Sequence, residues 1–393
     1  MQLMKTKLIS YILLLTILVS AISCAEEELA PAGALDCQTT AFPTNTHPKA
    51  SELQAIIDKY GAEGIAGQSL MVDGPSGFWL GTSGKADIAS DTDMQSCHKL
   101  IIASCTKTFT ASIIFLLVEE GRLSLTDKLP DYLPSELLDD VANAQEAQIQ
   151  DILSHRSGIP DFYTSEFELD RLNTFHNNFS QADMLEYTRG RKAETTIGGE
   201  YSYSNTNYLL LGMLLEEVLG KPLAQIYEER LFIPLGLNNS DFVSAVPDDL
   251  ASGYFPYNGN ALYEAERLYG DELGSADGGI VSTAYDMGRF MKMLAEGQVV
   301  NSQSLQKMTD WFDIPDEGED EDETRFTKNG FGLEFYETPE GITYGHTGAV
   351  DGFYTLMFYF PDQQTTFIYQ INGGTNFDAW LDAVNELRKA IFS

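Results

Sequence analysis

The residues from Phe109 to Glu120 form an apolar run that can be accommodated in only a few ways. Its apolar members include Phe109, Ile113, Ile114, Phe115, Leu116, Leu117 and Val118. Gly121 follows, and glycine commonly ends a helix because it adopts the left-handed conformation without strain. A helix that is apolar on nearly every face must be covered by other elements. The run therefore predicts a helix buried inside the core.

The four residues Ser104-Cys105-Thr106-Lys107 stand at the start of this predicted helix. Residues three apart share a helix face, so the amine of Lys107 can reach the hydroxyl of Ser104, as a base beside a nucleophile would. The free N–H groups and the positive dipole end of a helix start also favour an oxyanion there. The spacing alone is weak evidence, because Ser96–Lys99 and Ser304–Lys307 have it too.

The composition is that of a globular enzyme with an acidic surface. Of 393 residues, 43% are hydrophobic and 21% charged, and this length predicts one large domain or two interleaved domains. The formal net charge is −35, so the surface repels nucleic acid and anionic membranes, and we expect no nucleic-acid partner. The acidic run from Asp316 to Glu323 lacks EF-hand spacing, which favours a solvated loop over a calcium site.

The N-terminus has the pattern of an export signal. Lys5 and Lys7 precede an apolar stretch, Leu8 to Ile22, that is short for a membrane span. We expect residues 1–23 to be a signal peptide. Small residues before Cys24 resemble the lipidation site of bacterial lipoproteins, and simple signal cleavage is the alternative. The expected product is a periplasmic or outer-surface lipoprotein, held at a membrane only through this anchor.

An oxidising compartment would permit one disulfide. With Cys24 as the anchor, Cys37, Cys97 and Cys105 remain. Cys105 lies in the apolar helix and should be buried, so the candidate pair is Cys37 with Cys97.

The remaining patterns indicate a sheet made from both ends of the chain. Residues 24–49 lack periodicity and predict a flexible tether. Gln68–Val72 and Gly77–Leu80, joined by turn residues, predict a hairpin. Aromatic, alternating runs at 331–336, 341–346, 354–360 and 365–371 predict antiparallel strands. We therefore expect an α/β sheet domain from residues 50–125 and 275–393, with a helical domain, 126–274, inserted between them.

Two later motifs complete the pattern around Ser104. Tyr203-Ser204-Asn205 precedes a predicted helix, and His346-Thr347-Gly348 ends a predicted strand. With Ser104-x-x-Lys107, they occur in the order and at the wide separations of the penicillin-recognising serine hydrolases. Over nearly all residues after the tether, the chain resembles the branch with class C β-lactamases, D-alanyl-D-alanine carboxypeptidases and related esterases. Its motif sequences are most similar to those of the carboxypeptidases.

The resemblance implies a fold and a set of roles. The fold would combine α/β and all-α parts: an antiparallel sheet flanked by helices, with an inserted helical domain. Ser104 would form an acyl-enzyme, while Lys107 and Tyr203 would share proton transfer, and either could be the general base. The residues implied in substrate binding are Asn205, His346, Thr347, Gly348 and Ala349. The backbone N–H groups of Ser104 and Ala349 would form the oxyanion hole.

Several residues near these motifs have competing interpretations. Asn205 suits a substrate amide but could instead cap the following helix. His346 stands where many relatives have lysine, and its alternative is a core histidine. His155 we assign to structure. Cys105 is a rival nucleophile, but it points about 100° away from Ser104 on the helix and has no evident base.

The chain departs from carboxypeptidase relatives where those bind a terminal carboxylate. Such relatives commonly have an arginine on the preceding strand and a threonine just after His-Thr-Gly, and here these positions correspond to Tyr336 and Ala349. No arginine lies between Arg325 and Arg388. Losing these charge-assisted hydrogen bonds speaks against carboxypeptidase activity and favours an ester or apolar amide.

The sequence therefore predicts an exported serine hydrolase for a small acyl substrate: a peptidoglycan peptide, an ester or a β-lactam. The alternative is a catalytically idle penicillin-binding or sensor protein on the same fold, and an acyl transferase would differ only in its acceptor. We expect no metal or organic cofactor, because serine and lysine chemistry requires neither and the five histidines are not clustered.

Overall fold

The computed structural model describes residues 42–393, apart from 174–178, 244–245, 248, 258–260, 265–273, 316–323 and 377. The predicted signal peptide, Cys24, Cys37 and the acidic run 316–323 lie outside these residues. The described residues belong to one compact unit, and the boundaries expected for a sheet domain and an inserted helical domain stay a prediction. No helix in the described part of the chain is long and apolar enough to cross a membrane.

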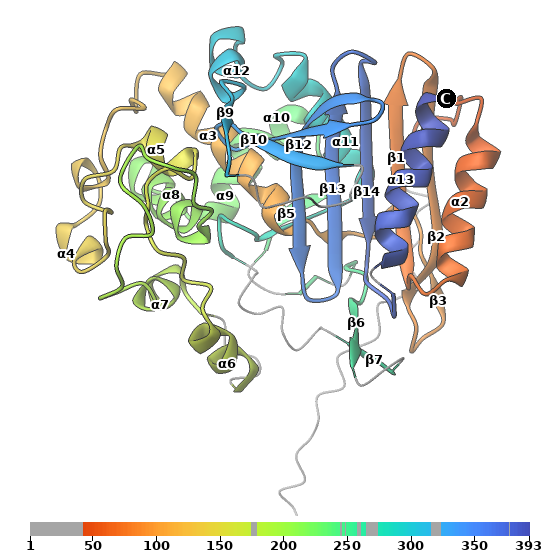
Figure 1. The fold of residues 1–393 in the computed structure, drawn as a ribbon, viewed down its shortest axis with the longest axis horizontal. Helices are drawn as coiled ribbons and strands as arrows, with labels where there is room; N and C mark the ends of the chain where they lie inside the picture. The colour runs from red at the N-terminus through yellow and green to blue at the C-terminus, as the bar shows by residue number, and fades with distance from the viewer. Residues whose placement is uncertain are drawn as a thin grey trace, which may run out of the picture. The chain divides into compact units, whose positions relative to one another are not determined.

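A nine-stranded antiparallel sheet forms the centre of the described structure, in the order β3-β2-β1-β14-β13-β12-β11-β10-β9 (Figure 1). Its strands are β1 (Gly67–Gly74), β2 (Gly77–Asp87), β3 (Thr92–Asp93), β9 (Phe312–Asp313), β10 (Arg325–Asn329), β11 (Glu334–Thr338), β12 (Gly341–Val350), β13 (Phe353–Phe360) and β14 (Thr365–Ile371). In the middle, Gln68 of β1 pairs with Ile371 of β14. The expectation that both chain ends build one sheet is confirmed.

The hairpin and the four late strands were expected close to where they occur. Three bounds differ clearly. The strand β2 continues to Asp87 instead of ending at Leu80, and β12 continues to Val350, so that the His346-Thr347-Gly348 motif lies inside this strand and not at its end. The strand β11 starts at Glu334 instead of Phe331. The residues before it form a turn, in which the N–H of Gly330 bonds the carbonyl of Leu333 and Gly332 has a φ of 77°. An apolar run alone does not reveal where a turn interrupts it.

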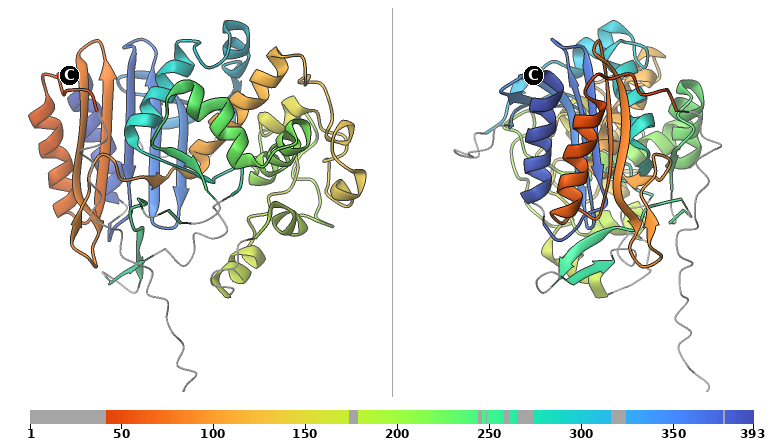
Figure 2. Two further views of the ribbon diagram at one scale, coloured as in Figure 1. Left: turned by 180° about the vertical axis from the view of Figure 1, so that it is seen from behind. Right: turned by 90° about the vertical axis from the view of Figure 1, so that its right-hand side faces the viewer.

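Two layers of helices cover the sheet. On one face lie α2 (Ala50–Ala62) and α13 (Asp378–Phe392), side by side in Figure 2. On the other face, α11 (Ala284–Ala295) contacts β1, β13 and β14. Side chains alternate across a strand, so Phe358 packs in the core beneath α2 and α13, whereas its neighbour Met357 packs in the larger core on the other side.

The predicted central helix is α3 (Thr106–Glu119), and it lies within the larger core. Phe109 is fully buried and stacks on Phe290 of α11 with 3.6 Å between ring centroids. The helix also contacts β12 and α8 (Asn205–Leu219). The prediction of a buried helix after Ser104 is confirmed, and its N-terminal end faces the junction between sheet and helices.

Short helices dominate the middle of the chain. They are η3 (Leu129–Asp131), α4 (Ser135–Leu138), α5 (Ile149–Leu153), α6 (Ser165–Asn173), α7 (Gln181–Glu186), α9 (Leu223–Tyr227), η4 (Glu228–Phe232) and α10 (Ile233–Leu235), with α12 (Ser302–Met308) later. The short strands β4 (Leu100–Ile101), β8 (Ile280–Ser282) and β5 (Ser240–Phe242) form a second sheet, and β6 (Tyr254–Tyr257) pairs with β7 (Ala261–Glu264).

The last residues of the predicted tether are held against the folded body. Asn45 exchanges two side-chain hydrogen bonds with the backbone of Leu80, in the way a neighbouring strand would. The amine of Lys49 donates to the carbonyl oxygens of Ala390 and Ser393, at 2.7 Å each. Residues 45–49, which the sequence assigned to the end of the tether, therefore contact the folded body, because an Asn side chain can complete a strand edge without hydrophobic periodicity. The tether over the preceding residues stays a prediction.

Candidate active site

A tight turn delivers Ser104 to the start of α3. The 3-10 turn η2 (Ala103–Cys105) precedes the helix, and Ala103 has a φ of 46°, which is uncommon for a residue with a Cβ. The turn is fixed from behind, because the N–H of Ile102 donates to the carbonyl of Ile280 in β8 at 3.0 Å. Residues held in such conformations cluster at functional sites, and here the strained residue directly precedes Ser104.

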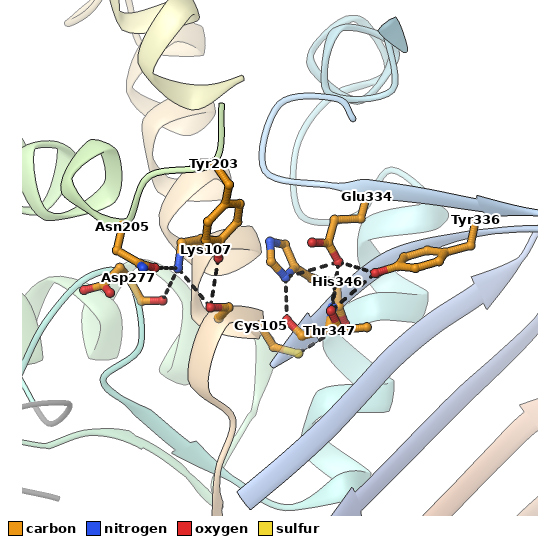
Figure 3. Close-up of polar contacts among 10 residues, drawn as sticks. Cys105, Lys107, Tyr203, Asn205, Asp277, Glu334, Tyr336, His346 and Thr347 are labelled. Atoms are coloured by element: carbon orange, nitrogen blue, oxygen red, sulfur yellow. Dashed lines mark hydrogen bonds and ion pairs between the residues drawn. The ribbon is translucent and has the colours of Figure 1, made fainter. Parts of the chain in front are cut away.

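Lys107 is fully buried and makes three hydrogen bonds (Figure 3). Its Nζ lies 3.0 Å from Ser104 Oγ, 2.8 Å from Asn205 Oδ1 and 2.9 Å from the backbone oxygen of Asp277. An amino group can hold three such partners in a tetrahedral arrangement. A hydrogen bond at each of the three positions of the Lys107 amino group thus offsets the cost of burying that group. The same bonds fix the side chain against Ser104.

Tyr203 approaches Ser104 from α8's side, and its hydroxyl lies 2.9 Å from Ser104 Oγ. Burial raises the pKa of Tyr203 well above its ordinary value, and the nearby carboxylate of Glu334 raises it further. The phenol is therefore protonated near neutral pH and donates its hydrogen to Ser104.

His155 supports the Tyr203 ring from behind. The two rings stack with centroids 4.4 Å apart, and His155 Nδ1 accepts the N–H of Ser204 at 3.2 Å. Burial lowers the pKa of His155 well below its ordinary value, and Lys107 and His346 add to this. A neutral histidine that holds Tyr203 in place agrees with the structural role assigned from the sequence.

Asn205 is the first residue of α8, and its side chain connects two site residues. While Oδ1 accepts from Lys107, Nδ2 donates to Asp161 Oδ2 at 3.1 Å, and the Asn205 backbone N–H donates to the other oxygen of Asp161. The Asn205 side chain does not cap the helix, because Ser204 occupies the N-cap position. The Asp161 carboxylate meets the first N–H of the helix instead.

The free edge of β12 runs past Ser104. Pairing between β11 and β12 stops at Glu334 and Gly345, and beyond it the N–H of Thr347 donates to Glu334 Oε2 at 2.8 Å. Strand backbone groups alternate with a period of two, so the N–H and C=O of Ala349 point to the same open edge as those of Thr347. Gly348 lies between them, and a Cβ there would come within 3.2 Å of the Ser104 nitrogen.

His346 is buried beside this edge. Its Nδ1 lies 2.6 Å from the Thr347 carbonyl oxygen, to which it donates. Burial lowers the pKa of His346, although Glu334 acts in the opposite direction. The ring therefore supplies no fixed positive charge where many relatives would have a lysine. The buried thiol of Cys105 donates to the His346 carbonyl at 3.2 Å, and burial raises the pKa of that thiol.

Sequence reasoning did not identify Glu334. Tyr336, which was expected at the position of the carboxylate-binding arginine, donates its hydroxyl to Glu334 Oε2 at 2.7 Å, and Glu334 itself reaches the site. The available signal was a single acid within the aromatic run Phe331–Tyr336. Asp161 and Asp277 were also missed, and nothing in their neighbouring sequence separates them from surface acids.

These groups surround a cavity of about 340 Å³. The predicted residues that line it are Ser104, Tyr203, Asn205, His346, Thr347 and Ala349. The other two predicted residues, Lys107 and Gly348, do not line the cavity. Lys107 hydrogen-bonds Ser104 from behind, and Gly348 of β12 packs against the backbone of Ile102 and Ser104. Phe162, Tyr163 and Phe167 form an aromatic wall, and Asp277, Gly278 and Glu334 complete the lining.

The other two Ser-x-x-Lys sequences form no such arrangement. Lys99 makes salt bridges with Asp241 and Asp249, and Lys307 pairs with Asp310. Within the part of the chain that the structure describes, no cluster of three or more His, Cys, Asp or Glu side chains could hold a metal ion. Cys97 is disulfide-bonded and Cys105 is free, while the pairing of Cys97 with Cys37 stays a prediction because Cys37 lies outside the described residues.

Comparison with known proteins identifies the fold and the family. Residues 53–389 match the Beta-lactamase family model. Penicillin-binding protein 4* of Bacillus subtilis (strain 168) is 26% identical over 339 residues, which are 82% of this chain and 72% of that protein. Protein flp of Staphylococcus aureus (strain MW2) is 28% identical over 199 residues, 50% of this chain but only 39% of that protein.

Similar solved structures share this fold. The D-amino acid amidase of Ochrobactrum anthropi SV3, complexed with D-phenylalanine, has 25% identity and a TM-score of 0.73, covering 87% of this chain and 98% of that one. A D-stereospecific amidohydrolase from Streptomyces sp., at 22% identity and a TM-score of 0.74, covers 88% and 99% and shows the shared fold. With its antiparallel sheet, its helices and its helical region, this chain belongs to the Beta-lactamase family and is a serine hydrolase of that family.

Proposed function

We propose that the chain hydrolyses the amide or ester bond of a small substrate through an acyl-enzyme on Ser104. The observation that carries this proposal is the position of Ser104 Oγ, 3.0 Å from Lys107 Nζ and 2.9 Å from Tyr203 Oη, at the wall of the cavity. Nucleophile, base and proton donor within hydrogen-bond reach are what covalent acyl transfer requires.

The hydrogen bonds of Lys107 favour it as the base that activates Ser104. A neutral amine donates two hydrogens and keeps one lone pair. Its two other partners, Asn205 Oδ1 and the Asp277 carbonyl, can only accept, so they would take both hydrogens and leave the lone pair facing Ser104 Oγ. Tyr203, a phenol with a raised pKa, then gives its proton to the leaving group and regains one from Lys107.

The oxyanion that forms during attack would be held by the N–H groups of Ser104 and Ala349. The first belongs to the turn at the start of α3, and the second points from the open edge of β12. Gly348 lets the strand approach the Ser104 backbone closely enough for both groups to reach one oxygen. Water then attacks the acyl-enzyme and releases the acid.

The relatives support a small amide substrate. One is named a D-amino acid amidase and was solved with D-phenylalanine, and another is named a D-stereospecific amidohydrolase. A small amide or ester is therefore the first candidate here, and a β-lactam is a candidate acylating agent. Peptidoglycan carboxypeptidase activity ranks lower, because Tyr336 stands where an arginine is expected for a terminal carboxylate, and the Glu334 carboxylate that it bonds has the opposite charge.

Export and lipidation at Cys24 belong to the same proposal and have their own test. They are supported by Lys5 and Lys7, the apolar stretch and the small residues before Cys24. Mass spectrometry of the mature chain from the native host should find a diacylated Cys24 at its start. A mature chain that starts elsewhere without lipid would reject the anchor.

The hydrolase is tested with the full chain, a fluorescent penicillin and a nitrophenyl ester. Ser104→Ala should abolish both labelling and turnover. Ser96→Ala is the matched control, since Ser96 has the same spacing to a lysine but does not line the cavity, and it should keep both. Equal turnover in Ser104→Ala and the parent would refute the assignment of Ser104. Penicillin labelling without hydrolysis of any substrate would favour the idle sensor protein instead.

A further inference from the structure

The cavity beside Ser104 is acidic. Among the described residues that line it, two are carboxylates, Asp277 and Glu334, and none is lysine or arginine. His346 adds no fixed charge, because burial lowers its pKa. Two cations lie near the lining. Lys107 lies behind Ser104 and hydrogen-bonds Ser104, Asn205 and Asp277 there, and Arg171, over the ring of Tyr163, pairs with Asp351 and Glu168. A substrate therefore meets a negative potential at the far side of the site.

Glu334 is the acid whose surroundings point to a ligand. Its side chain is 8% exposed, and no lysine or arginine among the described residues forms an ion pair with it. His346 Nδ1 lies 3.5 Å from Oε2, but it donates to the Thr347 carbonyl and burial lowers the pKa of this histidine. One carboxylate oxygen, Oε2, accepts from Thr347 N at 2.8 Å and from Tyr336 Oη at 2.7 Å. In Figure 3 the other oxygen points away from both donors. A buried carboxylate is costly without a cationic partner, so this oxygen is suited to one that arrives with the substrate.

We propose that Glu334 binds the ammonium group of an amino-acid amide or ester, so that the enzyme selects acyl groups with a free amine. This inference rests on the proposed acyl-enzyme at Ser104 and names the substrate class of that site. The aromatic wall of Phe162, Tyr163 and Phe167 would then receive the amino-acid side chain. Carbonyl, amine and side chain thus each have a matching group in one cavity.

The spacing along β12 agrees with an α-amino group. Glu334 is bound to the N–H of Thr347, and the oxyanion N–H belongs to Ala349, two residues further along the same edge. Two residues of strand span roughly 6.7 Å. A ligand that bridges Glu334 and the Ala349 N–H makes a hydrogen bond of about 2.9 Å at each end, so its amine and its carbonyl oxygen must lie close together, as they do in an α-amino acid.

The test compares two anilides that differ only in the amine. Phenylalanine 4-nitroanilide, as each enantiomer, has it, and 3-phenylpropanoic acid 4-nitroanilide lacks it. At about pH 6.5 the amine is charged, since α-amino groups titrate at about 7.7–8.0. For the full chain, kcat/KM for one phenylalanine enantiomer should exceed kcat/KM for the 3-phenylpropanoic anilide by about 10- to 100-fold. This is the factor expected for a hydrogen bond to a charged group.

Glu334→Gln should reduce this preference to within about threefold. The variant removes the charge but keeps an oxygen that can accept from the N–H of Thr347. Glu337→Gln is the matched control, because Glu337 is an exposed acid on the same strand and does not line the cavity, and it should keep the preference. An equal loss of kcat/KM for both anilides in Glu334→Gln would mean that the residue only holds β12, and it would overturn the inference.

Two further outcomes separate this inference from the proposed function. If ester cleavage depends on Ser104 but neither phenylalanine anilide is cleaved nor inhibits that reaction, the ammonium site is refuted and the hydrolase stands. If Ser104→Ala cleaves the anilides as well as the parent does, the proposed function fails first, and the inference fails with it.

Discussion

Gly348 packs so closely on Ile102 that a Cβ at residue 348 would lie 2.2 Å from the Ile102 carbonyl oxygen. This contact joins the edge of β12 to the turn before Ser104. No side chain fits between these two backbones, so the position of the Ala349 N–H relative to Ser104 depends on the absence of a Cβ.

Gly348→Ala should therefore impair catalysis more than folding. The strand must move away from Ser104, and losing one oxyanion donor costs about 10²- to 10³-fold in kcat. Overpacking should lower the free energy of unfolding by about 1–3 kcal/mol. Ester kinetics and urea denaturation measure the two effects. Gly61→Ala in α2, where the nearest atoms are side-chain atoms at 3.3 and 3.4 Å, is the control and should leave kcat unchanged.

Tyr203→Phe should remove the proton donor and keep the ring that stacks on His155. We expect kcat for an amide to fall by about 10²- to 10⁴-fold, the usual contribution of a general acid or base. Tyr208→Phe loses a fully buried hydroxyl, which bonds the Leu153 carbonyl at 2.9 Å outside the cavity. That control should lose about 1 kcal/mol of stability and little activity. Similar kinetics in the two variants would contradict the role of Tyr203.

Cys105→Ala should retain activity. The Cys105 thiol is buried, bonds the His346 carbonyl and has a pKa raised by burial, so it is not a nucleophile for the cavity. The expected effects are a loss of about 1 kcal/mol in stability and a change in ester kcat of less than about threefold. Loss of turnover, with the fold intact by circular dichroism, would restore Cys105 as a candidate nucleophile.

The stability of the protein should decrease below pH 6.5 because of its buried histidines. Burial lowers the pKa values of His155 and His346 in the folded state, with Lys107 facing both and Glu334 facing His346. Between the unfolded value of about 6.5 and these lowered values, the unfolded chain binds more protons. Stability is therefore complete above about pH 6.5 and is lost as the pH falls, by up to about 1.4 kcal/mol per unit for each histidine.

Urea denaturation between about pH 7.5 and 5.5 measures this slope, and His346→Gln should have a smaller one. Asp161, whose pKa is raised by burial, acts in the opposite direction, but it is present in both proteins and cancels in the comparison. Identical slopes would show that folding does not lower the pKa of His346.

Local sequence determined much of this protein. The apolar run after Ser104 had to become a buried helix, and the alternating strands had to form a sheet, because each pattern has one arrangement that removes its apolar side chains from water. Three short motifs, in order, predicted Ser104, Lys107 and Tyr203 as the catalytic candidates, since the motifs name the side chains that the chemistry needs. The structure places Lys107 and Tyr203 each within hydrogen-bond distance of Ser104.

Only the tertiary structure decided what surrounds them. Asp161 and the Asp277 carbonyl reach the site across gaps of 44 and 170 residues from their partners, which no local pattern encodes. In the sequence, Glu334 is one acid within an aromatic run, and Tyr336 corresponds to the position of an arginine in carboxypeptidase relatives. The end of β11 pairing at Gly345 turns Glu334 toward the cavity and ties Tyr336 behind it. Strand register and the end of a ladder are collective properties of the packed sheet, and so the character of the substrate pocket is decided there.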